Sequence, residues 1–332
     1  MPAEWLIEHG IAETRAILAH EGRILAARVD WAEPVRPGLV AQAQLIARPA
    51  GTRRGTVRLD NGHEALIEQL PRDATEGTTL TIRITRAAIA EKGRTKLPVA
   101  RPAPGEAPRP APALAQDLAA TGTPVRTLPV TENAFAAHGW EDLVEQALSG
   151  EIAFSGGTLL VCPTPAMTLI DIDGFAPPAQ LSLAAVPAIA SALVRLDIGG
   201  NVGIDFPTIP DRADRQAVDA ALEAALAANG WRGERTGMNG FGFVQLVSRL
   251  ERPSLVARFA RHPAAASVRT LLRTAERVAE PGALLLTAHP RTLDALTPEW
   301  EAELSRRTGR IIRRHPDPAL ALHAGFAQAV PL

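Results

Sequence analysis

Three aspartates stand at the ends of two apolar runs in the middle of the chain. Asp171 and Asp173 end the run Met167–Asp173, and Asp205 lies near the end of Asn201–Phe206. Continuous apolar runs bounded by Gly and Pro are typical of strands that are buried on both faces of a sheet. Burying a carboxylate is costly unless it is paired or binds a cation. Two such strands could bring Asp171 and Asp205 together at one sheet edge, as a hard-oxygen site suited to Mg²⁺ or Mn²⁺.

These residues also allow a plainer interpretation, in which Asp171 and Asp205 only cap loops or helices. Other chemistries have less support, because the sequence has no Gly-rich phosphate loop, His-Glu-x-x-His motif or nucleophile elbow. Ser155 precedes a Gly-Gly pair, but without an informatively spaced His or Asp it is interpreted as a turn residue. The eight histidines are scattered and suggest no metal cage. The single cysteine, Cys162, excludes an internal disulfide framework and is expected to lie inert in a buried strand.

Length and composition indicate a folded chain without a strong global charge. The 332 residues suffice for two or three small domains, and 46% of them are hydrophobic. The net charge of −1 provides no general attraction to nucleic acid, so any RNA binding must depend on local basic patches. No signal-peptide core and no run of 18 apolar residues occurs, so we expect a soluble, cytoplasmic protein with no membrane partner.

Three segments resemble, in this order, the nuclease core of the ribonuclease E/G family: GGTLLVCPTPAMTLIDID, LVRLDIGGNVGIDF and FGFVQLVSRLERPSL. The resemblance implies that Asp171 and Asp205 are the catalytic residues and hold a magnesium ion, because they match the two metal-binding aspartates of the family. Asp173 stands where the family usually has Asn, which keeps an oxygen ligand and adds a charge. The expected metal ligands are therefore Asp171, Asp173 and Asp205.

The resemblance implies a magnesium-dependent endoribonuclease that acts on single-stranded RNA, with Mn²⁺ as the alternative cofactor. Attack by a metal-activated water would leave 5′-phosphate and 3′-hydroxyl ends. Two other hypotheses stay open: a catalytically degenerate relative that binds RNA in a regulatory role, and a protein-interaction module that uses a Pro/Ala linker and an Arg-rich tail. The retained Asp171 and Asp205 favour catalysis, because a binding module does not need buried carboxylates.

The expected fold class is mixed α/β (α+β). It comprises a nuclease core with RNase-H-like and DNase-I-like subdomains, an inserted OB-type β-barrel and a small C-terminal α/β subdomain. The expected domains are a β-meander packing on the RNase-H-like part (1–34), an OB-fold RNA-binding domain (35–100), a Pro/Ala linker with a sensor remnant (101–138), the catalytic core (139–258) and the C-terminal subdomain (259–332).

Local patterns predict individual elements within this framework. Strands are predicted at Trp5–Glu8, Arg15–Ala19, Ile24–Val29, Gly38–Ile46, Gly55–Leu59, Glu64–Gln69, Thr78–Thr85, Phe241–Ser248, Ala283–Thr287 and Arg310–Arg314. Helices are predicted at Trp140–Leu148, from Pro187 onward, after an N-cap at Asp211, near Ala266–Val278 and at Pro298–Arg307.

Basic residues in and after the barrel are the candidates for RNA contact. The barrel set is Arg53, Arg54, Arg58, Arg83, Arg86, Lys92, Arg94 and Lys96, and the strongest candidates in the chain are Arg86, Lys96, Arg249 and Arg252. A solvated barrel surface is the alternative interpretation. No aromatic residue occurs between Trp31 and Phe135, whereas OB folds normally hold single strands on aromatic platforms. The barrel's hold on RNA should therefore be mainly electrostatic and weak.

Two family features are missing. Only residues 114–138 fill the interval that holds a sensor of the RNA 5′-monophosphate in family members, so we expect that sensing to be lost. The family's zinc-binding Cys-Pro-x-Cys motif is absent, so we expect a monomer or dimer rather than a zinc-linked tetramer. The densest basic cluster, with Arg306, Arg307, Arg310, Arg313, Arg314 and His315, is interpreted either as solvated surface or as a site for RNA or an acidic partner.

Overall fold

The computed structural model describes residues 2–91 and 93–332, so Lys92 of the expected basic set lies outside the described residues. The chain forms two compact units, and each unit is assembled from separate segments. Unit 1 comprises Met1–Ala32, Leu118–Ser149 and Arg258–Leu332, and unit 2 comprises Glu33–Asp117 and Gly150–Ala257. Mixed α/β structure with a closed five-stranded barrel agrees with the expected fold class at this coarse level.

Unit 1 begins with an antiparallel meander that confirms the first three predicted strands. It consists of β1 (Glu4–Gly10), β2 (Glu13–His20) and β3 (Arg23–Asp30), joined at the far edge by β11 (Val125–Thr127). The strand β11 runs parallel to β1, with Trp5 in register with Val125. Sequence patterns did not predict β11, since three residues are too few to show alternation.

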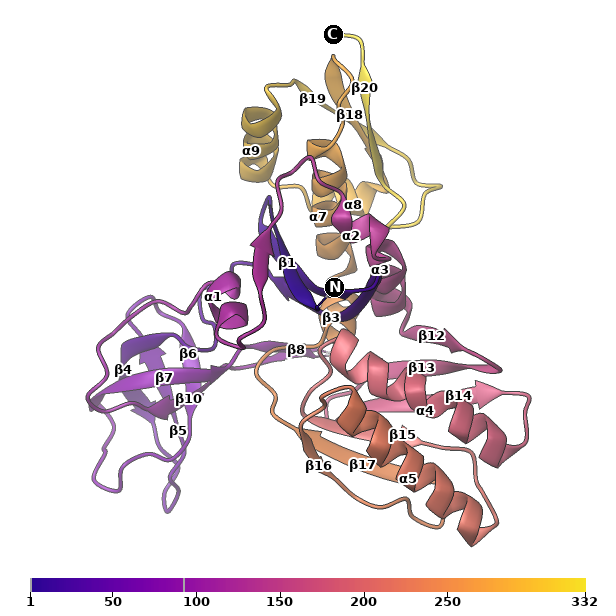
Figure 1. Cartoon of the computed structure of the whole chain (residues 1–332). Coiled ribbons are helices and arrows are strands. Elements are labelled where there is room, and N and C mark those ends of the chain that lie inside the picture. Colours follow the sequence, from indigo (N-terminus) through magenta and orange to yellow (C-terminus); the bar gives the residue numbers. More distant parts are fainter. Residues whose placement is uncertain (1, 92) are drawn as a thin grey trace. The chain divides into compact units, whose positions relative to one another are not determined.

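The remainder of unit 1 is a small α/β assembly (Figure 1). Its helices are α2 (Ala134–Ala137), α3 (Trp140–Ser149), α7 (Pro263–Glu276), α8 (Pro290–Asp294) and α9 (Pro298–Thr308). Its three-stranded sheet has the order β19 (Ile312–Pro316), β18 (Ala283–Ala288), β20 (Phe326–Val330). Leu272, Leu284, Leu286 and Leu304 are fully buried in the core between these elements. The helices and strands predicted in this region are confirmed within a few residues. The elements α2, α8 and β20 were not predicted.

The barrel of unit 2 is closed by a strand that the sequence analysis assigned partly to the linker. The strand order is β10 (Val99–Pro102), β6 (Glu64–Ile67), β5 (Gly55–Leu59), β4 (Val40–Ala47), β7 (Thr79–Arg86). The strand β10 pairs with both β6 and β7. Farther along, Arg109 exchanges backbone hydrogen bonds with Val40. The Pro/Ala segment therefore lies against the barrel over part of its length, because its backbone groups complete barrel hydrogen bonds.

A short hairpin and two short helices complete the connections around the barrel and the next domain. The hairpin consists of β8 (Ile89–Glu91) and β9 (Arg94–Lys96). The helix α1 (Leu114–Ala119) follows the Pro/Ala segment, and α6 (Leu255–Arg261) spans the chain boundary between the two units.

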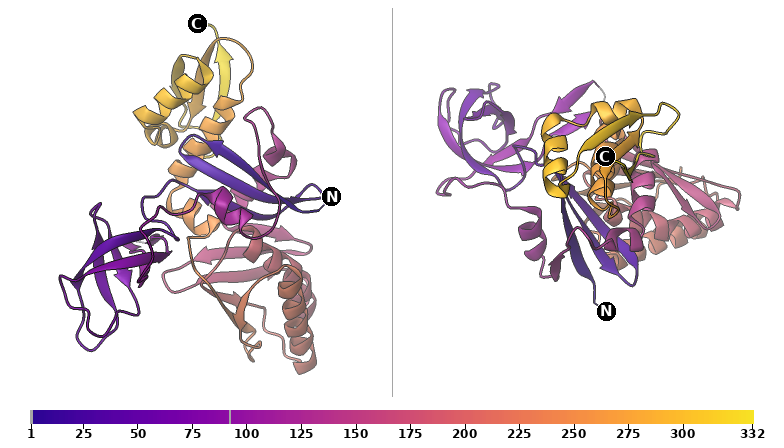
Figure 2. Two further views of the ribbon diagram at one scale, coloured as in Figure 1. Left: turned by 60° about the vertical axis from the view of Figure 1, so that its left-hand side comes forward. Right: turned by 90° about the horizontal axis from the view of Figure 1, so that it is seen from above.

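The second part of unit 2 is a six-stranded mixed sheet with two long helices on one face (Figures 1 and 2). Its order is β12 (Glu151–Phe154), β13 (Gly157–Pro163), β14 (Thr168–Gly174), β15 (Asn201–Asp205), β17 (Phe243–Ser248), β16 (Gly233–Arg235). The covering helices are α4 (Pro178–Arg195) and α5 (Arg212–Ala228). The predicted N-cap at Asp211 is confirmed, since its carboxylate accepts hydrogen bonds from the backbone amides of Ala213 and Asp214.

The prediction that a helix begins at Pro187 is wrong, because α4 begins at Pro178 and Pro187 lies inside it. Pro187 lacks an amide hydrogen, so the carbonyl of Leu183 has no intrahelical partner. Both residues lie on the exposed side of α4, where water can satisfy that carbonyl. The opposite side packs Leu181, Ala185 and Ile189 into the core, which holds the helix together across the proline.

Within the described residues, α4 is also the one helix whose length and hydropathy would suit a membrane span, and 44% of that window is buried in this fold.

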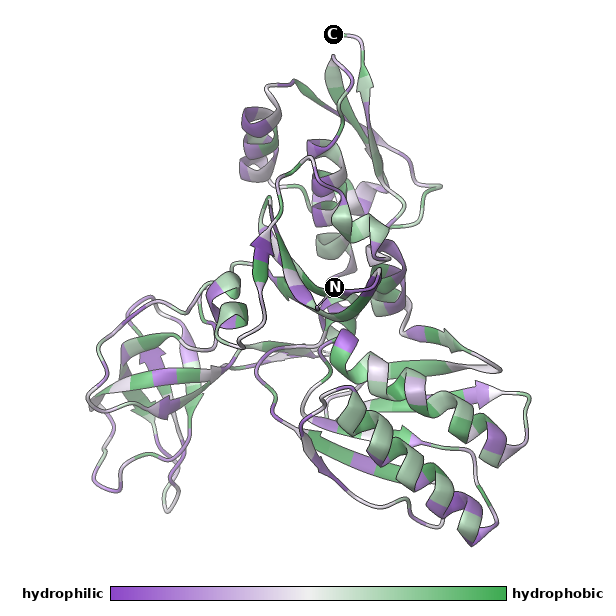
Figure 3. Ribbon diagram, in the orientation of Figure 1, coloured by the Kyte–Doolittle hydropathy of each residue, from purple (hydrophilic) through white to green (hydrophobic). Residues whose placement is uncertain are grey.

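The strands of this sheet are half-buried, so the expectation of strands buried on both faces is wrong. In β14, Ile170 and Ile172 are buried while Leu169, Asp171 and Asp173 are exposed. Hydrophobic residues dominate the central strands in Figure 3, but α4 and α5 cover only one of their faces. Cys162 belongs to the uncovered face and is exposed, which corrects the expectation that it is buried.

Candidate functional site

Asp171 and Asp205 lie side by side on the exposed face of the six-stranded sheet. They are direct partners in the parallel register of β14 and β15, and both side chains are exposed. Adjacent strands lie roughly 4.8 Å apart, so two in-register carboxylates on one face are near neighbours. The crossover that parallel strands require is provided by α4, which returns the chain to the end of the sheet where β14 begins, so that β15 runs parallel to β14. We call Asp171 and Asp205 the carboxylate pair.

The carboxylate pair keeps most of its oxygen atoms available to a ligand. One carboxylate oxygen of Asp171 accepts a hydrogen bond of 3.0 Å from the backbone amide of Ile172. Within residues 2–91 and 93–332, neither Asp173 nor Asp205 makes a side-chain hydrogen bond or an ion pair. An uncompensated pair of neighbouring anions attracts cations, and its hard oxygens match Mg²⁺.

Asp173 lies on the same face as the pair, two residues farther along β14. Two strand residues span roughly 6.8 Å, which places Asp173 farther from Asp205 than Asp171 is. No group of three or more His, Cys, Asp or Glu side chains among the described residues is arranged to hold a metal ion. The protein therefore contributes a pair rather than a closed cage, and the ligand role of Asp173 stays a prediction.

A second polar feature of unit 2 is a pocket of about 290 Å³ on which three arginines converge: Arg86, Arg101 and Arg249. We call it the arginine pocket. Glu68 forms an acidic part of its lining. One guanidinium nitrogen of Arg86 donates to the Leu97 carbonyl at 2.8 Å, but its buried Nε has no hydrogen-bond partner among the described residues. A buried donor without a partner is costly, which favours an acceptor from a ligand at this place.

The electrostatics of the arginine pocket also favour an anion. Burial is the largest influence on Arg86 and lowers its pKa, and the nearby carboxylates of Glu68 and Glu91 offset this effect only in part. Arg249 is 76% exposed and pairs with Glu251 at 3.0 Å. Among the residues that line the pocket, three arginines face the single carboxylate of Glu68, which would suit a phosphate.

The other two predicted RNA-binding residues are engaged in internal contacts. Lys96 pairs with Glu91 and donates to the Pro165 carbonyl at 2.8 Å, which connects the β8–β9 hairpin to the loop before β14. Arg252 is only 25% exposed and lies between Asp197 and Glu251. Burial opposes the charge of Arg252, but these carboxylates raise its pKa overall. Both residues therefore hold parts of unit 2 together.

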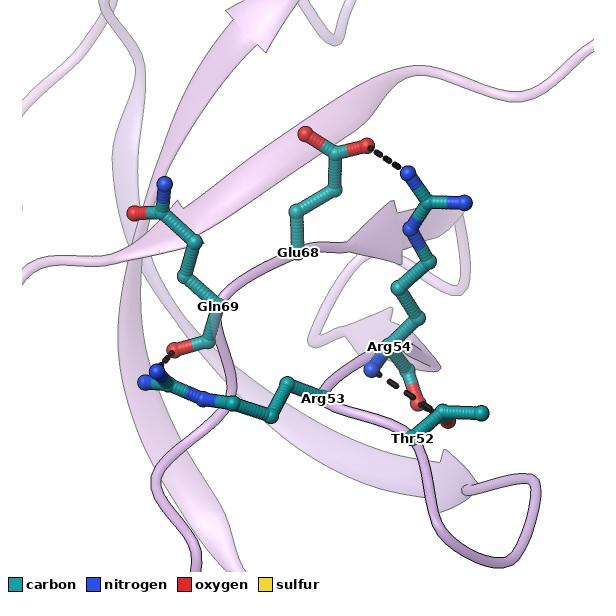
Figure 4. A pocket seen from close by; sticks show the side chains of 5 residues that line it. All are labelled: Thr52, Arg53, Arg54, Glu68 and Gln69. Atoms are coloured by element: carbon teal, nitrogen blue, oxygen red, sulfur yellow. Dashed lines mark hydrogen bonds and ion pairs between the residues drawn. The ribbon is translucent and has the colours of Figure 1, made fainter.

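Most of the barrel's remaining basic residues are also paired. An open pocket of about 480 Å³ lies on the barrel, and its lining residues are drawn in Figure 4. There Arg54 pairs with Glu68 at 3.4 Å, and Arg53 donates to the Gln69 carbonyl at 3.2 Å. Further pairs are Arg58 with Glu64 and Arg83 with Glu106 on the barrel, and Arg94 with Glu91 in the β8–β9 hairpin. Their charges are largely balanced, so they provide little net attraction for RNA.

Most side chains of the C-terminal basic cluster in unit 1 are also engaged within the fold. Arg306 and Arg307 both pair with Glu303, and Arg314 pairs with Glu301. Arg310 and Arg313 donate to backbone carbonyls. This arrangement supports the interpretation as a solvated surface.

Arg101 is a site candidate that the sequence analysis missed. It was assigned to a linker because Pro102 and the Pro/Ala run follow it. The strand β10 instead places Arg101 beside Arg83 of β7, on the outside of the barrel. The alternation of apolar Ala100 with charged Arg101 could have indicated a strand, but β10 has only four residues.

Comparison with known protein families supports the interpretation of this region. The model of the ribonuclease E/G family matches residues 112–250, a range that includes Asp171, Asp205 and Arg249. The match supports membership of that family and confirms the resemblance noted from the three motif segments. A search of curated proteins found no match.

Proposed function

We propose that this member of the ribonuclease E/G family is a magnesium-dependent endoribonuclease that cleaves single-stranded RNA. The observation that carries the proposal is the parallel register of β14 and β15, which sets Asp171 beside Asp205 on an exposed face. The family match spans both residues. A purely structural pair of neighbouring carboxylates would be expected to have compensating cations, and the described residues provide none.

The donor set of the carboxylate pair fits a hard divalent cation. Asp171 and Asp205 would hold Mg²⁺, or Mn²⁺ as the alternative, with Asp173 as a third candidate ligand. Mg²⁺ commonly binds through one or two carboxylates and keeps several waters, so an open pair is sufficient. When bound, the ion supplies a water nucleophile at neutral pH and offsets charge on the phosphodiester.

The arginine pocket would bind the RNA backbone at a place separate from the cleavage point. Asp205 is in register with Phe243 at the start of β17, whereas Arg249 follows the end of that strand. The five-residue rise from Phe243 to Ser248 corresponds to roughly 17 Å. A single strand that contacts both places would therefore be fixed by a backbone phosphate some distance from the phosphodiester near the carboxylate pair. Arg86 and Arg249 are the proposed contacts, and Arg101 joins them.

A cleavage assay on an end-labelled single-stranded RNA tests the proposal. The parent protein is expected to cleave only when Mg²⁺ is present and to leave 5′-phosphate ends. Asp171→Asn and Asp205→Asn are each expected to lower the rate by about 100-fold or more, as for other groups that stabilise transition-state charge. Asp294→Asn, at an exposed position of α8 in unit 1, is the matched control and should retain the parent rate.

The second candidate function is a catalytically degenerate relative that binds RNA. The observation in its favour is that no three potential metal ligands are grouped among the described residues. If the parent protein binds the labelled RNA but does not cleave it with Mg²⁺ or Mn²⁺, this alternative replaces the proposed nuclease.

A further inference from the structure

Two phenylalanines of unit 2 are far more exposed than the other large hydrophobic residues of that unit. Phe175 is 106% exposed and Phe241 is 82% exposed, whereas the next in unit 2 are Leu183 and Val247 at 43% each. Fully exposed aromatic rings give up most of the hydrophobic free energy that burial would provide. Exposed aromatic side chains at one place on a surface therefore point to a binding role.

Both phenylalanines lie at the same end of the strands, close to the carboxylate pair. Phe175 follows the end of β14, just beyond Asp173, and Phe241 precedes the start of β17. Strand β14 is parallel to β15, and β17 is antiparallel to β15. The end of β14 and the start of β17 therefore lie at the same end of the sheet as the end of β15. Strand β15, with Asp205 at its end, lies between them.

Glycines fix the backbone that presents each ring. Gly174 precedes Phe175, and a Cβ at Gly174 would lie 2.5 Å from the Gly156 carbonyl oxygen. Gly242 follows Phe241 with a φ of +90°, and a Cβ there would lie 2.5 Å from the Phe206 carbonyl oxygen. Phe206 in turn donates its amide to the Gly242 carbonyl at 3.2 Å, which ties the Phe241 loop to the end of β15. Each ring is thus presented from a defined position beside the carboxylate pair.

The barrel of unit 2 offers no aromatic ring on which a nucleobase could stack. The barrel contains no aromatic residue, since none occurs between Trp31 and Phe135. Single-stranded nucleic acid is commonly held by a combination of backbone charges and aromatic rings under the bases. The arginine pocket provides the charges, and the two exposed rings lie at the opposite end of β17.

We propose that Phe175 and Phe241 are stacking platforms for two nucleobases of single-stranded RNA, at the strand ends just beyond the carboxylate pair. The end of β14 and the start of β17 are two strand spacings apart, roughly 10 Å, so the rings contact different bases. Stacking would hold the RNA at these strand ends and so place a neighbouring phosphodiester at Asp171 and Asp205. A phenyl face accepts any base, so the platforms add affinity without strict sequence preference. This inference rests on the proposed function, because it names how the same site holds its substrate.

The test measures RNA binding in the Asp205→Asn protein with Mg²⁺ present, so that cleavage does not interfere. The probe is a single-stranded RNA with the fluorescent base 2-aminopurine at one position at a time. Stacking on a ring changes the fluorescence of that base, so specific positions should respond when the protein binds. Phe175→Ala and Phe241→Ala should each remove the response at a different position. Each change should weaken binding by at least about fivefold, the lower limit for losing one stacked base.

Two control variants separate stacking from other effects. Phe326→Ala, at a 43% exposed position of β20 in unit 1, should bind as the background protein does. Phe241→Leu keeps an apolar side chain without a π face, so it should behave like Phe241→Ala. The slope of binding affinity against salt should stay unchanged in all Phe variants, because no phosphate contact is lost.

Three outcomes would overturn the inference. The first is unchanged affinity and fluorescence in both Phe175→Ala and Phe241→Ala, which would leave the proposed nuclease intact if the parent protein still cleaves RNA. The second is full affinity in Phe241→Leu, which would mean that only apolar contact is needed. The third is a smaller particle mass in both alanine variants by sedimentation, which would identify the rings as a contact between two copies of the chain.

Discussion

At the scale of single residues, the added charge at Asp173 gives the carboxylate pair a testable asymmetry. Asp173→Asn should retain a near-parent cleavage rate at saturating Mg²⁺, because an amide oxygen can still serve as a ligand. It should require about tenfold more Mg²⁺ to reach that rate, since changes near a metal site commonly reduce affinity by that amount. Rates measured across Mg²⁺ concentrations for Asp173→Asn and for Asp205→Asn would show the contrast. Equal loss in both variants would contradict the assignment of Asp173 to a secondary position.

A different single residue, Glu8 of unit 1, is predicted to determine acid stability. Its fully buried carboxylate pairs with Arg15 at 2.7 Å, with Arg273 at 3.1 Å and with Arg277. Burial is the largest influence and alone would raise the pKa of Glu8, but the three arginines together outweigh it and hold the pKa below its ordinary value of 4.5. The folded state therefore gains stability from ionised Glu8 above pH 4.5, and this gain is lost as the pH falls below that value toward the lowered pKa.

We expect Glu8→Gln to reduce the free energy of unfolding by about 3–5 kcal/mol at neutral pH, because it leaves three arginines without their buried anion. Its stability should also depend less on pH below 4.5 than that of the parent. Urea unfolding at several pH values measures both effects. Glu132→Gln is the matched control, since the Arg126–Glu132 pair of unit 1 is partly exposed and should contribute little. A Glu8→Gln protein as stable as the parent would mean that the arginines find other partners.

At the scale of elements, α4 contains an interruption that can be removed. Pro187→Ala should restore an amide that can donate to the Leu183 carbonyl, at a position where both residues are exposed. The gain is offset by the greater freedom of the unfolded chain without a proline, so we expect a net stabilisation on the order of 1 kcal/mol. Thermal unfolding would measure it. Pro178→Ala is the control, because a proline at the first helical position costs no hydrogen bond.

Elements with a strong local pattern were predictable from the sequence, and α4 shows why others were not. Asp211 indicates the start of α5, because its side chain caps the helix. The long strands of the meander show an alternation of apolar and polar residues. In α4, Pro187 gave a start signal that was stronger than the true one at Pro178, since a proline is favourable at a helix start and unfavourable inside. Packing of Leu181 and Ala185 on the sheet overrode that local preference.

The sequence predicted which aspartates belong to the candidate site, but not which side chains surround them or that their face of the sheet is uncovered. Motif resemblance identified Asp171 and Asp205, and their strand neighbours gave no sign that one sheet face would stay uncovered. Leu169, Cys162 and Val247 are apolar but lie on that exposed face. The arginine pocket was beyond sequence reasoning, because it combines Arg86, Arg101 and Arg249 from segments that only tertiary structure brings together.

At the scale of the whole molecule, the short interval between the barrel and the six-stranded sheet leads to a prediction about the 5′ end of the RNA. Residues 114–138 form only α1, β11 and α2, with α3 following from Trp140. We therefore predict that RNAs with a 5′-triphosphate, a 5′-hydroxyl or a 5′-monophosphate are cleaved at similar rates. Otherwise identical oligonucleotides with the three ends would be compared in one assay. A strong preference for the monophosphate would show that another part of the chain recognises it.

The arginine pocket leads to a separate prediction about how RNA affinity depends on salt concentration. Arg101→Ala and Arg249→Ala should each weaken RNA binding and reduce the slope of log affinity against log salt by about 0.7, the value expected for one lost phosphate contact with a single strand. Both residues have exposed side chains, so the fold should be retained. Arg306→Ala is the control, because Arg306 lies in unit 1 and is paired with Glu303. Unchanged salt slopes in both pocket variants would exclude the pocket from the RNA path.

The segmented composition of unit 1 has a consequence for the order in which the chain folds during synthesis. Unit 2 is complete once Ala257 has been made, whereas unit 1 needs residues from Arg258 onward. In particular, Glu8 meets Arg273 and Arg277 only after more than 260 further residues have been added. Strand β1 therefore leaves the ribosome before α7, and of its three arginine partners Glu8 then has only Arg15 of the neighbouring strand β2. The carboxylate pair and its sheet can already assemble at this stage. Released chains that end between Ala257 and Arg273 should protect unit 2 from proteases and leave β1 open to cleavage.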